Sequence, residues 1–164
     1  MDQQRAERIL ADRSKRIRQP LRWAKVKNRA VAEFEVAVDN DLGEPLCFAG
    51  QYVPEAGIFK LQLLGEGRVP LYRFESNKEH HNRDCTRIVG PHTNRFTDAE
   101  HNLAEPETVI SATDIRAAIG QFAERVGIQR LPPVPLPPGT ALQLTMLHKG
   151  GERSEHRARS GSVD

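Results

Sequence analysis

Regular alternation of hydrophobic and polar residues marks four short strands in the first half of the chain. In the stretch AEFEVAVD, the side chains of Phe34, Val36 and Val38 fall on one face, which is the pattern of a strand with one buried face. The runs 46–53 and 58–64 are separated by the turn sequence PEAG and predict a hairpin. After GEGR, the stretch VPLYRFE predicts a fourth strand, whose proline must stand at its start or on a sheet edge.

An amphipathic helix is predicted over residues 113–126. Thr113 or Ser111 can cap its start, and Gly127 can end it. Its apolar stripe consists of Ile115, Ile119, Phe122, Ala123 and Val126. Such a helix covers one face of a sheet, so the expected fold class is α+β. We expect an antiparallel meander sheet of four to five or more strands, with GPHTNRF as the candidate fifth strand, one packed helix and a basic N-terminal helix.

The predicted organisation is one compact domain with flanking segments, as suits a chain of 164 residues. The α+β domain spans 31–128 and follows a basic N-terminal arm at 1–30. The segment 129–140 is rich in proline and predicts a stiff polyproline II linker, although its PxxP spacings also fit a ligand for an aromatic groove. A possible added strand, ALQLTML at 141–147, and a disordered tail at 148–164 complete the chain.

The net charge of +2 conceals a strongly basic N-terminal region. Residues 1–30 hold ten Lys and Arg against three Asp and Glu, and the absence of Gly and Pro over 2–18 predicts a helix there. Such an arm attracts RNA or an acidic protein partner through long-range, salt-sensitive forces. A merely solvated Arg-rich helix is the alternative. The candidate RNA-binding residues are Arg13, Lys15, Arg16, Arg18, Arg22, Lys25 and Lys27.

The apolar runs are too short for a membrane span, which needs roughly 18 to 20 residues, and the first residues are polar and charged. We therefore expect a cytoplasmic protein that has no membrane contact. Cys47 and Cys85 are the only cysteines and lie far apart in the chain. Reduced thiols are the simplest interpretation, and a single disulfide is the alternative.

The segment HHNRDCTRIVGPHTNRF, residues 80–96, concentrates three of the six histidines and three arginines. If VPLYRFE and PHTNRF are neighbouring strands, Arg73 and His92 share a face in one register and not in the next. When they share it, one imidazole can take the proton of a ribose 2′-OH and another can protonate the leaving oxygen, while the guanidinium stabilises the phosphoryl charge. This acid/base chemistry needs no metal and no cofactor.

Two other interpretations of this segment remain open. Imidazole and thiolate are the ligands that zinc prefers, and His81, Cys85 and His92 lie close in sequence, with His80 adjacent. Their spacing matches no recognised zinc pattern and lacks a fourth ligand, so no metal is expected. The other interpretation is a polar hairpin loop, in which His92 bonds backbone groups and the arginines are solvated.

The order of these residues resembles a loose group of small bacterial proteins that includes toxin components of TumE-type toxin-antitoxin pairs. Those proteins share the pattern Leu-x-Arg-Phe/Tyr-Asp, a His-rich loop, Pro-His-x-His and then a helix. Here the matching residues are Leu71, Arg73, Phe74 and Glu75, then His80 or His81 with Asn82, then Gly90, Pro91 and His92, and a helix from about Asp114. Asn94 replaces the second His and Glu75 replaces the Asp, so a second imidazole after His92 is missing.

The favoured function is a toxin-like small bacterial protein that binds RNA or acts on it, in its sharpest form as a metal-independent His/Arg ribonuclease. The candidate catalytic residues are His92, Arg73 and His81, with Glu75 and Arg95 in support. The alternative is a non-enzymatic interaction protein that docks a partner, such as an antitoxin, through the basic arm and the C-terminal strand. An enzyme should bring His92, Arg73 and one further histidine together, whereas a scaffold should scatter them.

Overall fold

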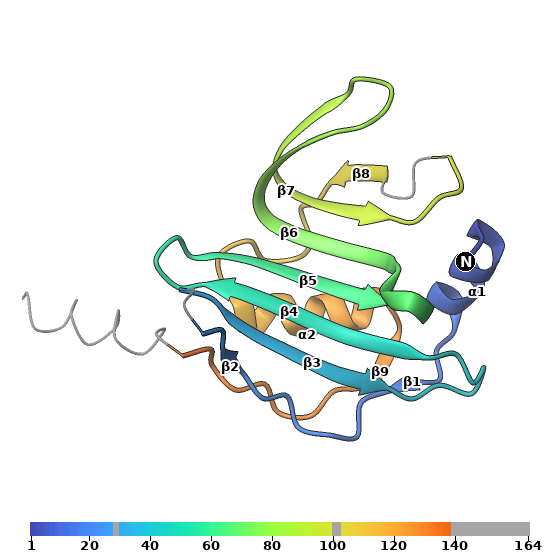
Figure 1. The fold of residues 1–164 in the computed structure, drawn as a ribbon, viewed down its shortest axis with the longest axis horizontal. Coiled ribbons are helices and arrows are strands. Elements are labelled where there is room, and N and C mark those ends of the chain that lie inside the picture. Colours follow the sequence, from blue (N-terminus) through green and yellow to red (C-terminus); the bar gives the residue numbers. More distant parts are fainter. Residues whose placement is uncertain (28–29, 100–102, 139–164) are drawn as a thin grey trace, which may run out of the picture.

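Seven strands form one antiparallel sheet in the order β2-β3-β4-β5-β6-β7-β8 in the computed structural model, which describes residues 1–27, 30–99 and 103–138 (Figure 1). The strands are β2 (Ala24–Lys25), β3 (Ala32–Val38), β4 (Leu46–Val53), β5 (Ile58–Leu64), β6 (Pro70–His81), β7 (Arg87–Arg95) and β8 (Leu103–Pro106). Each strand pairs with the next one along the chain, so the predicted meander and the α+β class are confirmed.

Helix α2 (Ile115–Arg125) covers the inner face of the sheet, as its apolar stripe predicts (Figure 1). The ring of Phe122 is fully buried and stacks on Phe48 of β4, with 5.4 Å between ring centroids. The helix begins with Asp114, whose carboxylate accepts hydrogen bonds from two backbone N–H groups of the first turn. Asp114 is therefore the N-cap in place of Thr113 or Ser111, and Gly127 follows the helix with a φ of +79°.

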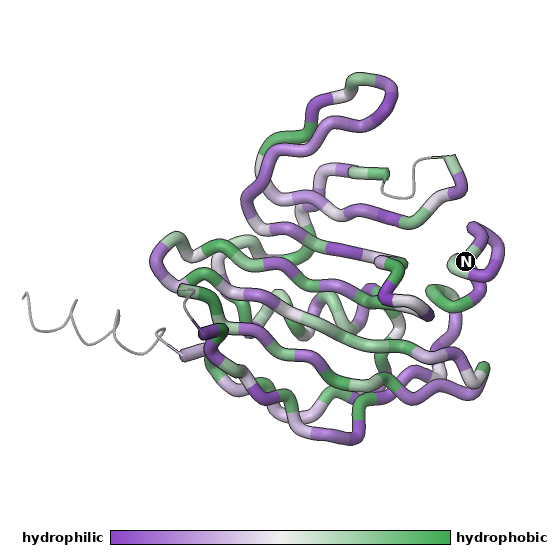
Figure 2. The backbone as a smooth tube through the Cα atoms, viewed as in Figure 1, coloured by the Kyte–Doolittle hydropathy of each residue, from purple (hydrophilic) through white to green (hydrophobic). Residues whose placement is uncertain are grey.

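Hydrophobic and hydrophilic residues alternate along the strands, which separates an inner from an outer face (Figure 2). On β3, Phe34, Val36 and Val38 are buried on the inner face, while Glu35 and Ala37 are exposed on the outer one. The same alternation across β4 and β5 makes the outer face of the sheet polar. Residues of β6 and β7 can therefore form one site on this surface only where their side chains share the outer face.

The N-terminal helix is shorter than predicted. Helix α1 (Gln3–Ala11) ends before Asp12, and Lys15–Arg16 form β1, which pairs in parallel with β9 (Ile128–Arg130). The prediction of a helix to residue 18 is wrong because the Lys15 ammonium donates to carbonyls at the end of α1 and so replaces the next helical turn. The described part of the basic region is packed onto the domain, with Ala6, Ile9, Ile17 and Leu21 in the core.

The proline-rich segment lies against an aromatic side chain of the N-terminal region. The indole N–H of Trp23 donates to the carbonyl of Pro135 at 3.0 Å, and Leu131 and Val134 pack against the core. Trp23 also packs edge-on against Phe34, with 4.8 Å between ring centroids. The expected strand at 141–147 and the expected tail lie outside the described residues.

Within the described residues, no helix is long and apolar enough to cross a membrane.

Candidate functional site

The register of β6 and β7 brings the candidate residues to one face. Arg73 stands opposite Asn94, and Glu75 stands opposite His92. All four therefore lie on the outer face of the sheet, which alternation along the strands could not establish without the register.

Glu75 is the centre of this cluster. Its Oε2 lies 3.3 Å from Arg73 Nη2 and 3.3 Å from His92 Nε2, and its Oε1 lies 3.4 Å from Lys78 Nζ. Arg73 is held in turn by a 3.0 Å hydrogen bond from its Nε to Asn94 Oδ1. One largely buried carboxylate thus faces two permanent cations and an imidazole.

His92 is completely buried, with 0% of its surface exposed. Its Nδ1 lies 2.9 Å from the carbonyl oxygen of Gly90, and because a carbonyl only accepts, Nδ1 carries a hydrogen. Nε2 is then the nitrogen that can take a proton. Among the described residues, three buried atoms of the cluster have no well-aligned hydrogen-bond partner: His92 Nε2, Glu75 Oε2 and Asn94 Nδ2.

The second histidine near His92 is His80, whereas the prediction named His81. The His80 and His92 rings are 5.8 Å apart between centroids. Burial lowers the pKa of His80, and the nearby His92 and Arg73 lower it further. His81 points to the other side of the hairpin, where its Nε2 lies 3.0 Å from Glu79 Oε1, because neighbouring residues of a strand alternate in direction. Both histidines end strand β6 and do not lie in a loop.

Lys60 also belongs to the cluster, although the sequence analysis did not select it. It pairs with Glu75 across β5 and β6, and burial together with the charges of Arg73 and Lys78 lowers its pKa. Its alternation with Phe59 and Leu61 already indicated an outward side chain. What was missing was the register that places it beside Glu75.

Arg95 lies apart from the cluster, because it follows Asn94 on β7 and so faces the opposite side. Its side chain is 46% exposed, and its nearest acidic partner is Glu105, with 3.9 Å between Nη2 and Oε1. The structure therefore does not bring Arg95 together with His92.

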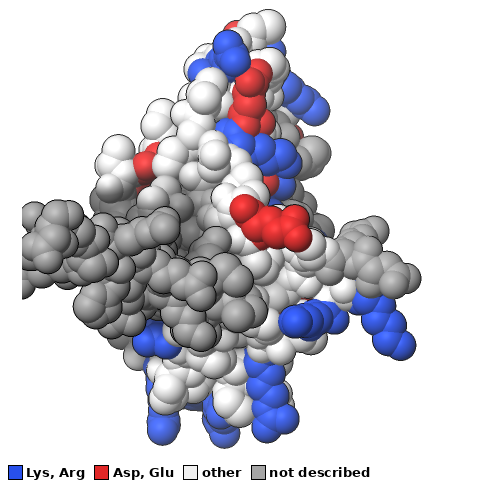
Figure 3. All heavy atoms as spheres, turned by 90° about the vertical axis from the view of Figure 1, so that its left-hand side faces the viewer, with Lys and Arg blue, Asp and Glu red and all other residues white. Residues whose placement is uncertain are grey.

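The predicted RNA-binding residues of the N-terminal region divide into three groups. Lys15 is fully buried and cannot contact RNA. Arg16 and Arg18 form ion pairs with acidic residues, and Arg13 donates to a backbone carbonyl. In the part of the chain that the structure describes, Arg22, Lys25 and Lys27 are exposed and form no ion pair. Figure 3 faces the side that carries β2 and shows basic side chains along its lower part and on the hairpin at its top.

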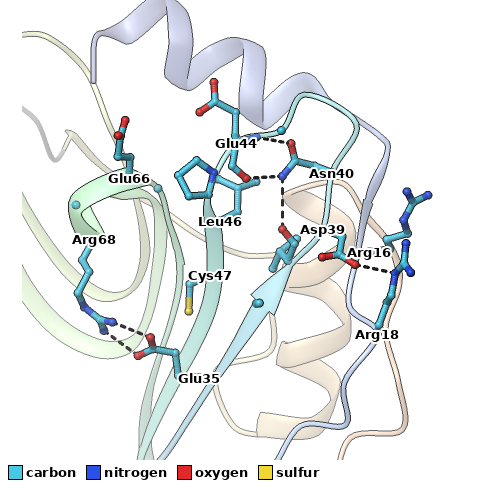
Figure 4. Close-up of a pocket in the computed structure, with 16 residues that line it drawn as sticks. Arg16, Arg18, Glu35, Asp39, Asn40, Glu44, Leu46, Cys47, Glu66 and Arg68 are labelled. Atoms are coloured by element: carbon cyan, nitrogen blue, oxygen red, sulfur yellow. Dashed lines mark hydrogen bonds and ion pairs between the residues drawn. The ribbon is translucent and has the colours of Figure 1, made fainter.

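Two hollows lie along the sheet, with volumes of about 890 and 360 Å³. The larger one lies over the end of β3, the start of β4, the turn between them and residues 65–68, and the smaller one lies over β2, β3, β4 and β5. Acidic and basic residues alternate around the larger one, where Arg68 binds Glu35 at one side and Arg18 binds Asp39 at the other (Figure 4). Arg5 joins Glu44 and Glu66 above it. These arginines are already neutralised by carboxylates, so the larger hollow carries no excess of positive charge.

Neither cysteine is bonded to the other: Cys47 is half-buried and Cys85 is exposed. Burial and the neighbouring Glu35 raise the pKa of Cys47 to about 11, so its thiol is protonated and unreactive near neutral pH. Within the described ranges, no three His, Cys, Asp or Glu side chains converge as metal ligands would.

Comparison with protein-family models, with curated proteins and with solved structures finds no match to this chain.

Proposed function

We propose that the protein binds RNA through the outer face of its sheet, with phosphate groups held by the cluster around Glu75. The observation that carries this proposal is the gathering of Lys60, Arg73 and Lys78 around Glu75. We name these three residues with Glu75, His80 and His92 the Glu75 cluster. A phosphodiester is the common biological ligand for such an excess of cationic donors.

The charge balance of the Glu75 cluster supports an anionic ligand. Three cations gather at Glu75, and Glu33 is the second carboxylate that acts on Lys60, so the cations exceed the carboxylates by one. His80 adds a further polar group beside them. Lys78 is accessible, with 63% of its side chain exposed, and Arg73 keeps 17% exposed. The larger hollow differs, because its arginines are paired with acids. The Glu75 cluster is therefore the favoured phosphate site.

Arg22 extends the proposed contact beyond one phosphate, because it is exposed and lines the smaller hollow on the outer face. Lys25 pairs with the inward-facing Ala32 and therefore lies on the other side of the sheet. Arg22 precedes β2, which is four strands away from β6 in the same sheet. At about 4.8 Å per strand, the two basic regions are roughly 19 Å apart. An RNA strand of several nucleotides can span this distance and contact both, and such contacts are independent of base sequence.

Metal-independent RNA cleavage is the second candidate function, and the pair of imidazoles favours it. His92 carries its hydrogen on Nδ1, so Nε2, which faces Glu75 Oε2 at 3.3 Å, is the candidate general base toward a ribose 2′-OH. His80, at 5.8 Å between ring centroids, is the second imidazole that such a cleavage uses. The resemblance to toxin components supports the same chemistry, and a cytoplasmic location suits the two free cysteines.

RNA binding is tested by fluorescence anisotropy with a labelled single-stranded RNA at a series of salt concentrations. Lys78→Ala should weaken binding and make the dependence of log affinity on log salt shallower by about one unit, because one phosphate contact is lost. Arg73→Lys should also weaken it, because the planar fork is lost while the charge remains. Arg116→Ala is the matched control, since Arg116 is exposed on α2 across the inner face.

The proposal is wrong if RNA does not bind at low salt, or if Arg116→Ala weakens binding as much as Lys78→Ala does. Binding of an acidic protein together with no binding of RNA would favour the non-enzymatic interaction protein instead.

A further inference from the structure

The hairpin formed by the ends of β6 and β7 extends beyond the rest of the sheet. We define hairpin 78–89 as the part beyond the irregularity that interrupts the β6–β7 register between Glu75 and Lys78. Figure 1 shows this hairpin curving away from β5, with β8 lying between its tip and the lower half of β7. The hairpin is held together internally, because Glu79 of β6 forms an ion pair with Arg87 of β7 and also binds His81 of its own strand. It can therefore move as one unit.

The tip of the hairpin is fastened to β8 by one side chain. Asn82 Nδ2 donates to the carbonyl of Ala104 at 3.0 Å, and the N–H of Ala104 donates to Asn82 Oδ1 at 2.9 Å. The amide thus bonds both backbone groups of Ala104, as a residue of a neighbouring strand would. Arg83 adds a hydrogen bond to the carbonyl of Ala99 at 2.6 Å. The Asn82–Ala104 contact joins residues twenty-two positions apart and closes the curl of the sheet.

The base of the hairpin has the features of a hinge. The backbone N–H of Phe59 donates to Ser76 Oγ at 2.9 Å, which anchors β6 to β5 as far as Ser76, the first residue of the irregularity. Beyond it, Asn77 is exposed and falls outside the paired positions. Gly90 stands opposite Lys78 and has a φ of +92°, which only glycine adopts readily. The space beside it is open, because a Cβ atom added at this position would have no atom within 4 Å. The chain can therefore turn at this level while β6 stays fixed.

Two polar side chains that could bind a ligand are buried while the hairpin is closed. His92 is wholly buried and Asn94 is 2% exposed. Among the described residues, Asn94 Nδ2 has no hydrogen-bond partner, and His92 Nε2 has only its 3.3 Å ion-pair contact with Glu75 Oε2 and no aligned hydrogen-bond partner. Buried polar atoms normally find one. A ribose-phosphate unit offers the matching groups, because its 2′-OH can donate to a basic imidazole nitrogen and its phosphate oxygens can accept from an amide and from Arg73.

We propose that hairpin 78–89 is a lid over His92 and Asn94, hinged at Asn77 and Gly90 and held shut by the Asn82–Ala104 contact, and that it opens to admit a ribose-phosphate unit of RNA. The ligand class rests on the proposed RNA function. The opening itself is a property of the free protein and is measurable without RNA.

The opening is tested by acylating histidines with diethyl pyrocarbonate and mapping the products by mass spectrometry. In the wild-type protein, His92 should react far more slowly than His81, whose side chain is 61% exposed. Asn82→Ala should raise the rate at His92 roughly ten- to hundred-fold, as expected for the loss of two hydrogen bonds, and should leave His81 unchanged. Asn82→Asp keeps the acceptor but loses the donor, so its rate should fall between the two.

Cys85→Gly is the control for a change at the hairpin tip. Cys85 is exposed and has a φ of +68°, so glycine fits its backbone and the Asn82–Ala104 contact stays intact. This variant should acylate His92 at the wild-type rate. Backbone hydrogen exchange of β3, β4 and β5 should be the same in all variants, which separates lid opening from unfolding.

The lid is refuted if Asn82→Asp, folded by the exchange criterion, leaves the rate at His92 unchanged, or if His92 already reacts as fast as His81 in the wild type. RNA enters as a second measurement. Single-stranded RNA should slow acylation of His92 in Asn82→Ala. If Asn82→Ala accelerates acylation but RNA neither binds nor protects, the lid stands and the proposed RNA function fails.

Discussion

Lys15 offers a direct test of the tertiary structure, because a lysine ammonium is rarely enclosed as completely as this one. Its exposed fraction is 0%, and its Nζ donates to the carbonyl of Ile9 at 2.5 Å and to that of Asp12. Burial lowers the pKa of Lys15 to about 8, and the nearby Asp12 opposes this shift only in part. The unfolded chain leaves the same group near its ordinary value of 10.5.

The sign of the pH dependence follows from these two values. Between pH 8 and 10.5 the unfolded chain binds more protons at Lys15 than the folded protein does, so stability rises with pH in this window. Below pH 8 Lys15 is charged in the folded protein, and the full cost of burying this charge lowers the free energy of unfolding. This cost disappears as the lysine loses its proton in the folded state at higher pH. The gain between pH 7 and pH 10 is about 2 to 3 kcal/mol for this shift.

The assay is urea denaturation of the wild type and of Lys15→Met at pH 7, 8.5 and 10. Methionine has a similar length but does not titrate, and all other titrating groups are common to both proteins. The difference in unfolding free energy, wild type minus variant, should therefore rise by about 2 to 3 kcal/mol from pH 7 to pH 10. A difference that stays constant over this range would show that Lys15 is solvated, and the position of α1 against β1 would then be wrong.

Two further predictions concern the core and the Glu75 cluster. Phe122→Ala should lower the unfolding free energy by about 3 to 5 kcal/mol, because a fully buried ring that stacks on Phe48 leaves a cavity; an unchanged thermal melt would contradict the packing of α2 on the sheet. His92→Ala should cost about 2 to 4 kcal/mol, since it removes a buried side chain and its bond to Gly90. Calorimetry measures this loss of stability. A loss close to zero would show that the His92 imidazole is exposed and not buried.

The sequence by itself determined the elements of the domain. Alternation along 32–38, 46–53 and 58–64 predicted β3, β4 and β5 because each strand buries one face only. The stripe of Ile119 and Phe122 predicted the covering helix for the same reason. The strands and the helix could be predicted because they depend on the spacing of hydrophobic residues along the chain, which can be read directly from the sequence.

Only the tertiary structure decided which side chains meet. The β6–β7 register placed Glu75 beside His92, and the interruption after Glu75 turned His80 toward His92 in place of His81. The tip of the hairpin that carries His80 is joined to β8 by Asn82 bonding Ala104, twenty-two residues away. A one-residue slip reverses every outward side chain of a strand, and a long-range contact forms only after the chain has folded. Local pattern therefore predicted where the histidines concentrate, and the pairing of distant strands decided what they touch.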